Sequence, residues 1–143
     1  MDNLKIEIPG KPAYLTAVRL AISSIATTAG FSLDDVEDVK TAVSEAVTNC
    51  IVHAYPESVG RIRLKMRILE GGLLEIAVQD WGKGIEDVEK AREPLFTTGG
   101  EERGGMGFTI MESFTDKLRV RSRPGRGTVV IMQRQIRSRA RRT

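Results

Sequence analysis

Three polar side chains recur at helical spacing within an otherwise largely apolar segment of the chain. Glu45, Asn49 and His53 are each separated by four residues, so they share one stripe of a helix. A carboxylate can accept a proton, and an amide oxygen is a hard ligand suited to Mg²⁺, so Glu45 and Asn49 can serve one small site. A solvated helix face that ends in a histidine explains the same spacing.

Two glycine-rich segments follow, and both are typical of sites that bind flat or anionic ligands. Asp80 precedes Gly82 and Gly84 at the expected end of a strand. A carboxylate there can accept a hydrogen bond from an exocyclic amine, and glycines permit close approach of the main chain. Residues 103–108 run from a loop into a helix, where free amide groups and Arg103 favour phosphate. A plain turn and a flexible connector are the alternatives.

The hydrophobic pattern predicts which elements position these residues. Apolar side chains recur at helical spacing in some segments and alternate with polar ones in others. The consecutive hairpins predict an α+β fold, a two-layer sandwich of a mixed, mostly antiparallel sheet with helices on one face. Neither a P-loop nor a G-x-G-x-x-G motif occurs, so a nucleotide site would be of another kind. We expect strands at 4–8, 61–68, 74–80, 118–122 and 128–132, helices at 12–30, 32–56, 88–92 and 108–114, and a loop at 95–105.

Length and composition limit the classes of protein to consider. The 143 residues fit one domain, which we assign to residues 1–133, with residues 134–143 as a basic, disordered tail. The single cysteine, Cys50, excludes an internal disulfide and a cysteine-based zinc site. No apolar run approaches the roughly 20 residues that span a bilayer, and the start is polar. We therefore expect a cytoplasmic protein with no membrane contact.

The charge is divided unevenly along the chain. Residues 1–116 hold twelve Lys and Arg against nineteen Asp and Glu, a net charge of −7, whereas residues 117–143 hold ten basic residues and no acid. The net charge of +3 is thus an average over an acidic body and a basic end. Five arginines among the last ten residues could add non-specific contacts to nucleic acid. A solvated terminus is the commoner meaning of such a run, so we expect no nucleic-acid partner.

Four short motifs, in order, resemble the nucleotide boxes of the gyrase, chaperone, histidine-kinase and mismatch-repair ATPase superfamily. The pair Glu45 and Asn49 resembles the N box, and Asp80-x-Gly82-x-Gly84 the first glycine box. Residues 44–55 and 94–112 are similar to the anti-sigma factor serine-protein kinases of the sporulation anti-sigma-F and stress-response type. This resemblance covers residues 4–132 and implies a histidine-kinase-like ATPase fold. The second glycine box is matched by Gly105-x-Gly107 and the last by Gly127-Thr128.

The resemblance implies ATP and Mg²⁺ as cofactors and a role for each matching residue. Glu45 would be the general base toward a substrate serine, Asn49 the Mg²⁺ ligand, and Asp80 the acceptor of the adenine amino group. Residues 95–105 would form a lid over the nucleotide. The other implied nucleotide contacts are Gly82 and Gly84 at the base, Thr128 through water, Arg103, Gly105 and Gly107 at the phosphates, and Thr97, Thr98, Met106 and Phe108.

The resemblance also implies partners. The chain would be a homodimer that sequesters a sigma factor and phosphorylates an anti-anti-sigma protein of the STAS type on serine. An ATP-binding switch that controls its partner without phosphoryl transfer is the alternative. A detached histidine-kinase catalytic domain is a weaker alternative, because no phosphoacceptor helix is present. Three features depart from the family pattern: the short loop at 99–102, Gly104 in place of a serine, and Trp81.

Overall fold

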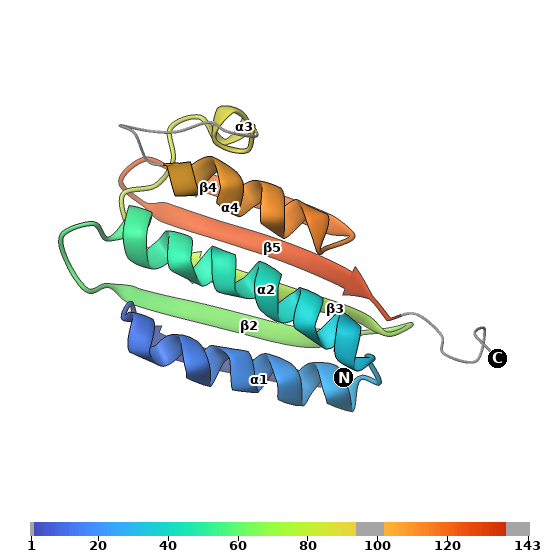
Figure 1. The fold of residues 1–143 in the computed structure, drawn as a ribbon. Coiled ribbons are helices and arrows are strands. Elements are labelled where there is room, and N and C mark those ends of the chain that lie inside the picture. Colours follow the sequence, from blue (N-terminus) through green and yellow to red (C-terminus); the bar gives the residue numbers. More distant parts are fainter. Residues whose placement is uncertain (1, 94–101, 137–143) are drawn as a thin grey trace.

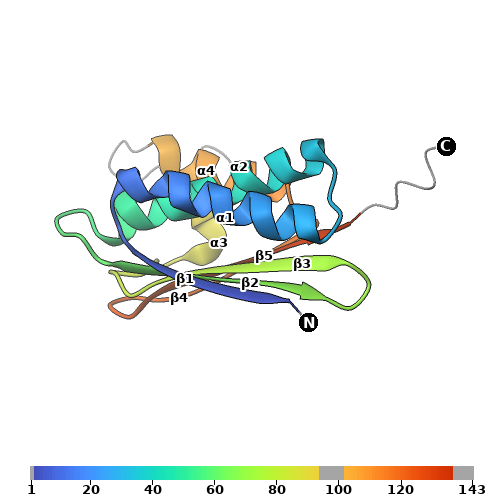
Figure 2. The same ribbon diagram turned by 90° about the horizontal axis from the view of Figure 1, so that it is seen from below.

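The computed structural model describes residues 2–93 and 102–136, which form one sheet with helices on one face (Figure 1). Seen from below, the helices form one layer and the strands the other (Figure 2). None of the described helices is long and apolar enough to cross a membrane. The elements are β1 (Asn3–Pro9), a 3₁₀ turn (Pro12–Tyr14), α1 (Leu15–Thr28), α2 (Leu33–Asn49), a π-helical turn η2 (Cys50–Ala54), β2 (Arg61–Leu69), β3 (Leu73–Asp80), α3 (Val88–Ala91), α4 (Glu102–Ser113), β4 (Lys117–Arg123) and β5 (Gly127–Gln135).

The sheet has the strand order β1-β2-β3-β5-β4, and every pairing among these strands is antiparallel. The expected two-layer α+β sandwich is confirmed, and its sheet is antiparallel rather than mixed. The reason lies in the connections, because one hairpin joins β2 to β3 and another joins β4 to β5. Between β1 and β2 the chain passes back along α1 and forward along α2. The start of β2 therefore lies beside the end of β1, where Pro9 pairs with Arg61.

The hydrophobic core lies between the helices and the inner face of the sheet. Helix α2 begins at an N-cap, where the Ser32 hydroxyl accepts a hydrogen bond from the Asp35 N–H (3.2 Å). Strand alternation buries one side of β2 and β3 and leaves the other toward water. Side chains with at most 3% exposure include Val18, Ile22, Val39, Val43, Val47, Ile62, Leu64, Met66, Ile76, Val78 and Met111.

The fourth helix begins earlier than expected. We assigned residues 95–105 to a loop, but α4 starts at Glu102, so residues 102–105 are helical. Glycine in a helix costs about 1 kcal/mol per residue. Burial of Phe108 and Met111 in the core stabilises the same helix and offsets that cost. The rest of the expected lid, residues 95–101, lies outside the described residues.

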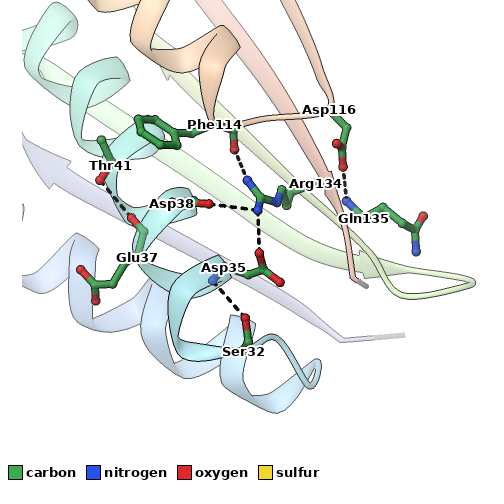
Figure 3. A network of polar contacts seen from close by, with 9 residues as sticks. All are labelled: Ser32, Asp35, Glu37, Asp38, Thr41, Phe114, Asp116, Arg134 and Gln135. Carbon is green, nitrogen blue, oxygen red and sulfur yellow. Dashed lines mark hydrogen bonds and ion pairs between the residues drawn. The ribbon is translucent and has the colours of Figure 1, made fainter. Parts of the chain in front are cut away.

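The ordered domain also extends beyond the expected boundary at residue 133. Strand β5 runs to Gln135, and Arg134 is buried. Its guanidinium donates to Asp35 Oδ1 (2.6 Å), to Asp38 Oδ2 (3.0 Å) and to the Phe114 carbonyl (2.7 Å) (Figure 3). A run of arginines predicts a solvated tail, but here two carboxylates of α2 compensate one arginine for its loss of water. Residues 137–143 of the expected tail lie outside the described residues.

Candidate nucleotide-binding site

The candidate site lies at the C-terminal end of α2, where the helix changes type. Glu45 and Asn49 are half-buried and lie one α-helical turn apart, as expected from their spacing. The next residues form η2, in which the Tyr55 N–H donates to the Cys50 carbonyl five residues earlier (3.3 Å). Because a π-helical turn holds more residues than an α-helical one, His53 does not continue the stripe of Glu45 and Asn49 as we expected. Such turns frequently occur at functional sites.

Asp80 is held tightly at the end of β3. It pairs with Thr128 of β5 and is only 4% exposed. Its Oδ1 accepts hydrogen bonds from the N–H groups of Gly82 (2.9 Å) and Thr128 (3.2 Å), and its Oδ2 accepts one from the Cys50 thiol (3.4 Å). Burial raises the pKa of Asp80, and the three donors partly offset that rise. The carboxylate is thus fixed in direction, and Oδ2 can accept one further hydrogen bond.

Cys50 joins the N box to Asp80. It directly follows Asn49 in the chain, and its buried thiol donates to Asp80 across 30 positions of sequence. Burial, and then the charge of Asp80, raise the pKa of Cys50 well above its usual value, so the thiol stays protonated and available as a donor at neutral pH. In the sequence, Cys50 is only one of several apolar residues spaced along this helix. A contact over this separation leaves no local signal.

The glycines after β3 allow three segments of main chain to approach closely. A Cβ on Gly82 would lie 2.7 Å from the Cβ of Ala54, and a Cβ on Gly84 would lie 2.7 Å from the carbonyl carbon of Arg123. Gly84 also has a φ of +79°, which favours glycine. We expected both glycines to give a flat ligand access to the main chain. In the structure they let the loop after β3 pack between η2 and the β4–β5 turn.

Two hydroxyl groups that the sequence did not single out hold the same loop. The Tyr55 hydroxyl accepts a hydrogen bond from the Trp81 N–H (2.7 Å). The Ser122 hydroxyl accepts from the Ile85 N–H (2.7 Å) and lies 2.7 Å from the hydroxyl of Thr128. Alternation along β4 was a signal that places Ser122 on the inner face, whereas Tyr55 follows an irregular turn and offered none. These bonds position the surroundings of Asp80.

Helix α4 brings the second glycine box against the N box. A Cβ on Gly107 would lie 3.1 Å from both the Oδ1 and the Nδ2 of Asn49, so only a glycine leaves this amide undisturbed. An α-helix leaves its first four N–H groups free. The N–H of Gly105 is among those four, and Gly107 lies in the second turn of the helix. Phe108 is buried, so its side chain belongs to the core.

The remaining expected contacts are placed only in part. Arg103, Gly105 and Met106 belong to the first turns of α4, and nothing is described of their side chains. Thr97 and Thr98 lie outside the described residues. The structure therefore brings together Asn49, Cys50, Asp80, Gly82, Gly107 and Thr128 through the contacts given above.

The donor groups present can be compared with the needs of Mg²⁺. Within residues 2–93 and 102–136, no cluster of three or more His, Cys, Asp or Glu side chains could hold a metal ion. Mg²⁺ in nucleotide sites usually takes one or two protein ligands and completes its shell with phosphate oxygens and water. The half-buried amide of Asn49, held against Gly107, fits this requirement as a single protein ligand.

Comparison with known proteins defines the class to which this fold and site correspond. A family model described as a histidine kinase-like ATPase domain matches residues 8–134, and the chain belongs to that family. Its relatives include proteins named anti-sigma F factor. The chain is 51% identical over 136 residues to that of Caldanaerobacter subterraneus subsp. tengcongensis and 42% identical to that of Clostridium acetobutylicum. Both alignments cover 94% of this chain and 94% of the relative.

Solved structures of low sequence identity share the fold. The crystal structure of the RsbU and RsbW domains of Rv1364c from Mycobacterium tuberculosis matches with a TM-score of 0.70 at 19% identity, over 95% of this chain and 33% of that longer one. The mycobacterial sensor histidine kinase MprB matches with a TM-score of 0.59 at 16% identity, over 94% of this chain and 99% of that one. The expected histidine-kinase-like ATPase fold and the resemblance to anti-sigma factors are confirmed.

Proposed function

We propose that this chain is an anti-sigma factor that binds ATP with Mg²⁺ and phosphorylates an anti-anti-sigma partner of the STAS type on serine. The name of its relatives, anti-sigma F factor, supports the binding of a sigma factor, and its family supports ATP as the nucleotide. One observation carries the proposal: the Cys50 thiol, next to Asn49, donates to Asp80 at 3.4 Å, while Gly107 abuts the Asn49 amide. An adenine acceptor and a metal ligand are thereby joined in one site.

In this proposal the adenine binds at the end of β3. The Oδ2 of Asp80 accepts the amino group of the base, because its Oδ1 is already taken by two main-chain donors. The Thr128 hydroxyl supports the base through water, and the main chain at Gly82 and Gly84 borders it. Guanine carries a carbonyl in place of that amino group, so it would place an acceptor against a carboxylate. The site should therefore discriminate against GTP.

The phosphates bind between α2 and the start of α4. Asn49 ligates Mg²⁺, which neutralises phosphate charge that the acidic body of the chain would otherwise repel. Arg103 and the free N–H groups of the first turn of α4, including that of Gly105, hold the β- and γ-phosphates. Thr97, Thr98, Met106 and the main chain at Phe108 complete the proposed set. Gly107 belongs to the same proposed set, and its missing side chain also leaves room for Asn49.

Glu45 is the proposed general base. It lies one turn before Asn49 on α2, so its carboxylate can take the proton of a serine hydroxyl that is positioned next to the γ-phosphate. The serine oxygen then forms a bond to the γ-phosphorus, the bond from that phosphorus to the ADP oxygen breaks, and the proton remains on Glu45. We further propose that the protein acts as a homodimer in the cytoplasm and holds one sigma factor.

Phosphoryl transfer to the cognate anti-anti-sigma protein from labelled ATP tests the assignment. We expect Glu45→Gln to slow transfer by about 10² to 10⁴-fold while ATP binding changes little. Glu37→Gln, on the exposed side of the same helix, is the matched control and should transfer at the wild-type rate. Equal rates for Glu45→Gln and wild type would exclude Glu45 as the base. A wild-type protein that binds ATP and a sigma factor without any transfer would instead favour the switch.

A further inference from the structure

One face of the sheet points away from the helices (Figure 2). The residues that strand alternation and register place on this face include far more cations than anions. Strand alternation directs one set of side chains to this face, and no described element covers it. Its two acidic residues are Glu7 on β1 and Glu75 on β3. We call it the basic sheet face, and its cations are Lys5 on β1, Arg61, Arg63, Lys65 and Arg67 on β2, and Lys117, Arg119, Arg121 and Arg123 on β4.

The register places these cations on both flanks of a less polar centre. Directly paired residues point to the same side of a sheet, so each cross-strand row can be followed through the pairings. Half-buried apolar residues occupy the middle strands, where a water-facing sheet normally carries polar ones. One row is Lys5, Lys65, Ala77, Ile131 and Arg119, and the next is Glu7, Arg63, Gln79, Val129 and Arg121.

The acids of this face already have partners. Glu7 pairs with Arg63 (3.0 Å), and Glu75 pairs with Arg67 (2.8 Å). Among the described residues, no carboxylate forms an ion pair with Lys65 or with the β4 cations, although the charge of Arg119 also acts on Glu75. The excess of positive charge on this face therefore has two sources. One is β2, which belongs to the acidic body of the chain, and the other is β4, which belongs to its basic end.

The spacing of the two flanks selects the kind of partner. Strands β2 and β4 are three strand spacings apart, which is about 14 Å. An α-helix with its side chains is about 10 to 12 Å wide, so it fits between the two cationic rows when it lies along the strands. A nucleic-acid backbone would neutralise the cations but offers nothing apolar to cover Ala77, Val129 and Ile131. A helix with an apolar stripe and acidic flanks matches both features.

We propose that the basic sheet face docks an amphipathic, acidic α-helix of a protein partner. The apolar stripe of that helix would cover Ala77, Val129 and Ile131, and its acidic side chains would reach Lys65 on one side and Arg121 on the other. This interaction goes beyond the nucleotide site, because that site is built from α2, α4 and inward-facing residues. It leaves both faces of the protein free to act at once.

A synthetic 18-residue peptide with a leucine stripe and glutamates on both sides of it is the probe, used with the full chain. Trp81 is the single tryptophan and stacks against Arg61, whose guanidinium carbon lies 3.9 Å from the ring centroid, so its fluorescence reports on this face. We expect the peptide to change the Trp81 emission saturably and with an affinity that falls as salt rises. A peptide of the same composition in scrambled order should bind at least tenfold more weakly. Equal binding of the two would overturn the proposal.

Charge reversal locates the interaction. The double variant Lys65→Glu with Arg121→Glu should bind the peptide about tenfold more weakly than wild type. The double variant Lys11→Glu with Lys90→Glu has the same net charge but alters exposed positions outside this face, and it should bind like wild type. Thermal unfolding of both variants checks that they fold. Equal loss in both variants, tighter binding of a 20-nucleotide single strand than of the peptide, or self-association through this face would each refute the proposal.

Discussion

Removal of the Arg134 guanidinium should destabilise the protein far more than its place near the C-terminus suggests. This one group donates to Asp35, Asp38 and the Phe114 carbonyl, so it links the end of β5 to the start of α2 and the end of α4 (Figure 3). The side chains of Arg134 and Asp35 are only 10% and 11% exposed. The substitution Arg134→Met keeps much of the side-chain length but removes all three hydrogen bonds.

The expected loss of stability follows from the carboxylate charge that remains buried in the variant. Asp35 would keep a buried charge without its cation, and loss of one partner of a buried pair typically costs about 3 to 5 kcal/mol. For a domain of this size that corresponds to a fall of about 10 to 20 °C in the midpoint of thermal unfolding. The double variant Arg134→Met with Asp35→Asn should recover part of the loss, because it removes the carboxylate charge that Arg134 compensated. An exposed pair would contribute at most about 1 kcal/mol.

Urea unfolding followed by circular dichroism measures these free energies of unfolding. The control is Arg126→Met in the exposed β4–β5 turn, which should lie within about 0.5 kcal/mol of wild type. A loss below about 1 kcal/mol for Arg134→Met would show that the pair behaves as a solvated surface pair. The expected role of Arg134 in anchoring the strand would then be wrong.

Three further variants test the site. Tyr55→Phe leaves the Trp81 N–H without its acceptor and should cost about 1 kcal/mol in urea unfolding, whereas Tyr14→Phe, at an exposed ring, should cost nothing measurable. Gly107→Ala should weaken binding of Mg-ATP about tenfold in calorimetry without lowering thermal stability, because its Cβ crowds the N-box amide while alanine favours the helix; unchanged affinity would contradict the contact. Burial raises the pKa of Asp80, so the folded state binds this proton more tightly than the unfolded state does. Wild type should therefore lose stability relative to Asp80→Asn as pH rises from about 3.8 through the raised pKa. A parallel pH dependence of the two proteins would argue against that shift.

Much of the site could be anticipated because its motifs are local in sequence. Glu45 and Asn49 were placed together by helical spacing, and Asp80 by its position at the end of an alternating strand. The π-helical turn could not be anticipated, because an apolar helix end gives the same pattern whether its last turn is α or π. Its consequence is local, since it removes His53 from the stripe of Glu45 and Asn49.

The sequence by itself determined the elements, their order and the family, because hydrophobic periodicity, capping residues and turn glycines act between near neighbours in the chain. Only the tertiary structure decided which charges are buried and which share a surface. Arg134 and Asp35 are 99 positions apart, and nothing near either residue distinguishes this arginine from those of a solvated terminus. Likewise, the cations of β2 and β4 share one face because the register of the strand pairings points them to the same side, although two central strands lie between them. The burial of a side chain and its distance from other charges depend on how the strands and helices assemble, and that depends on the whole chain.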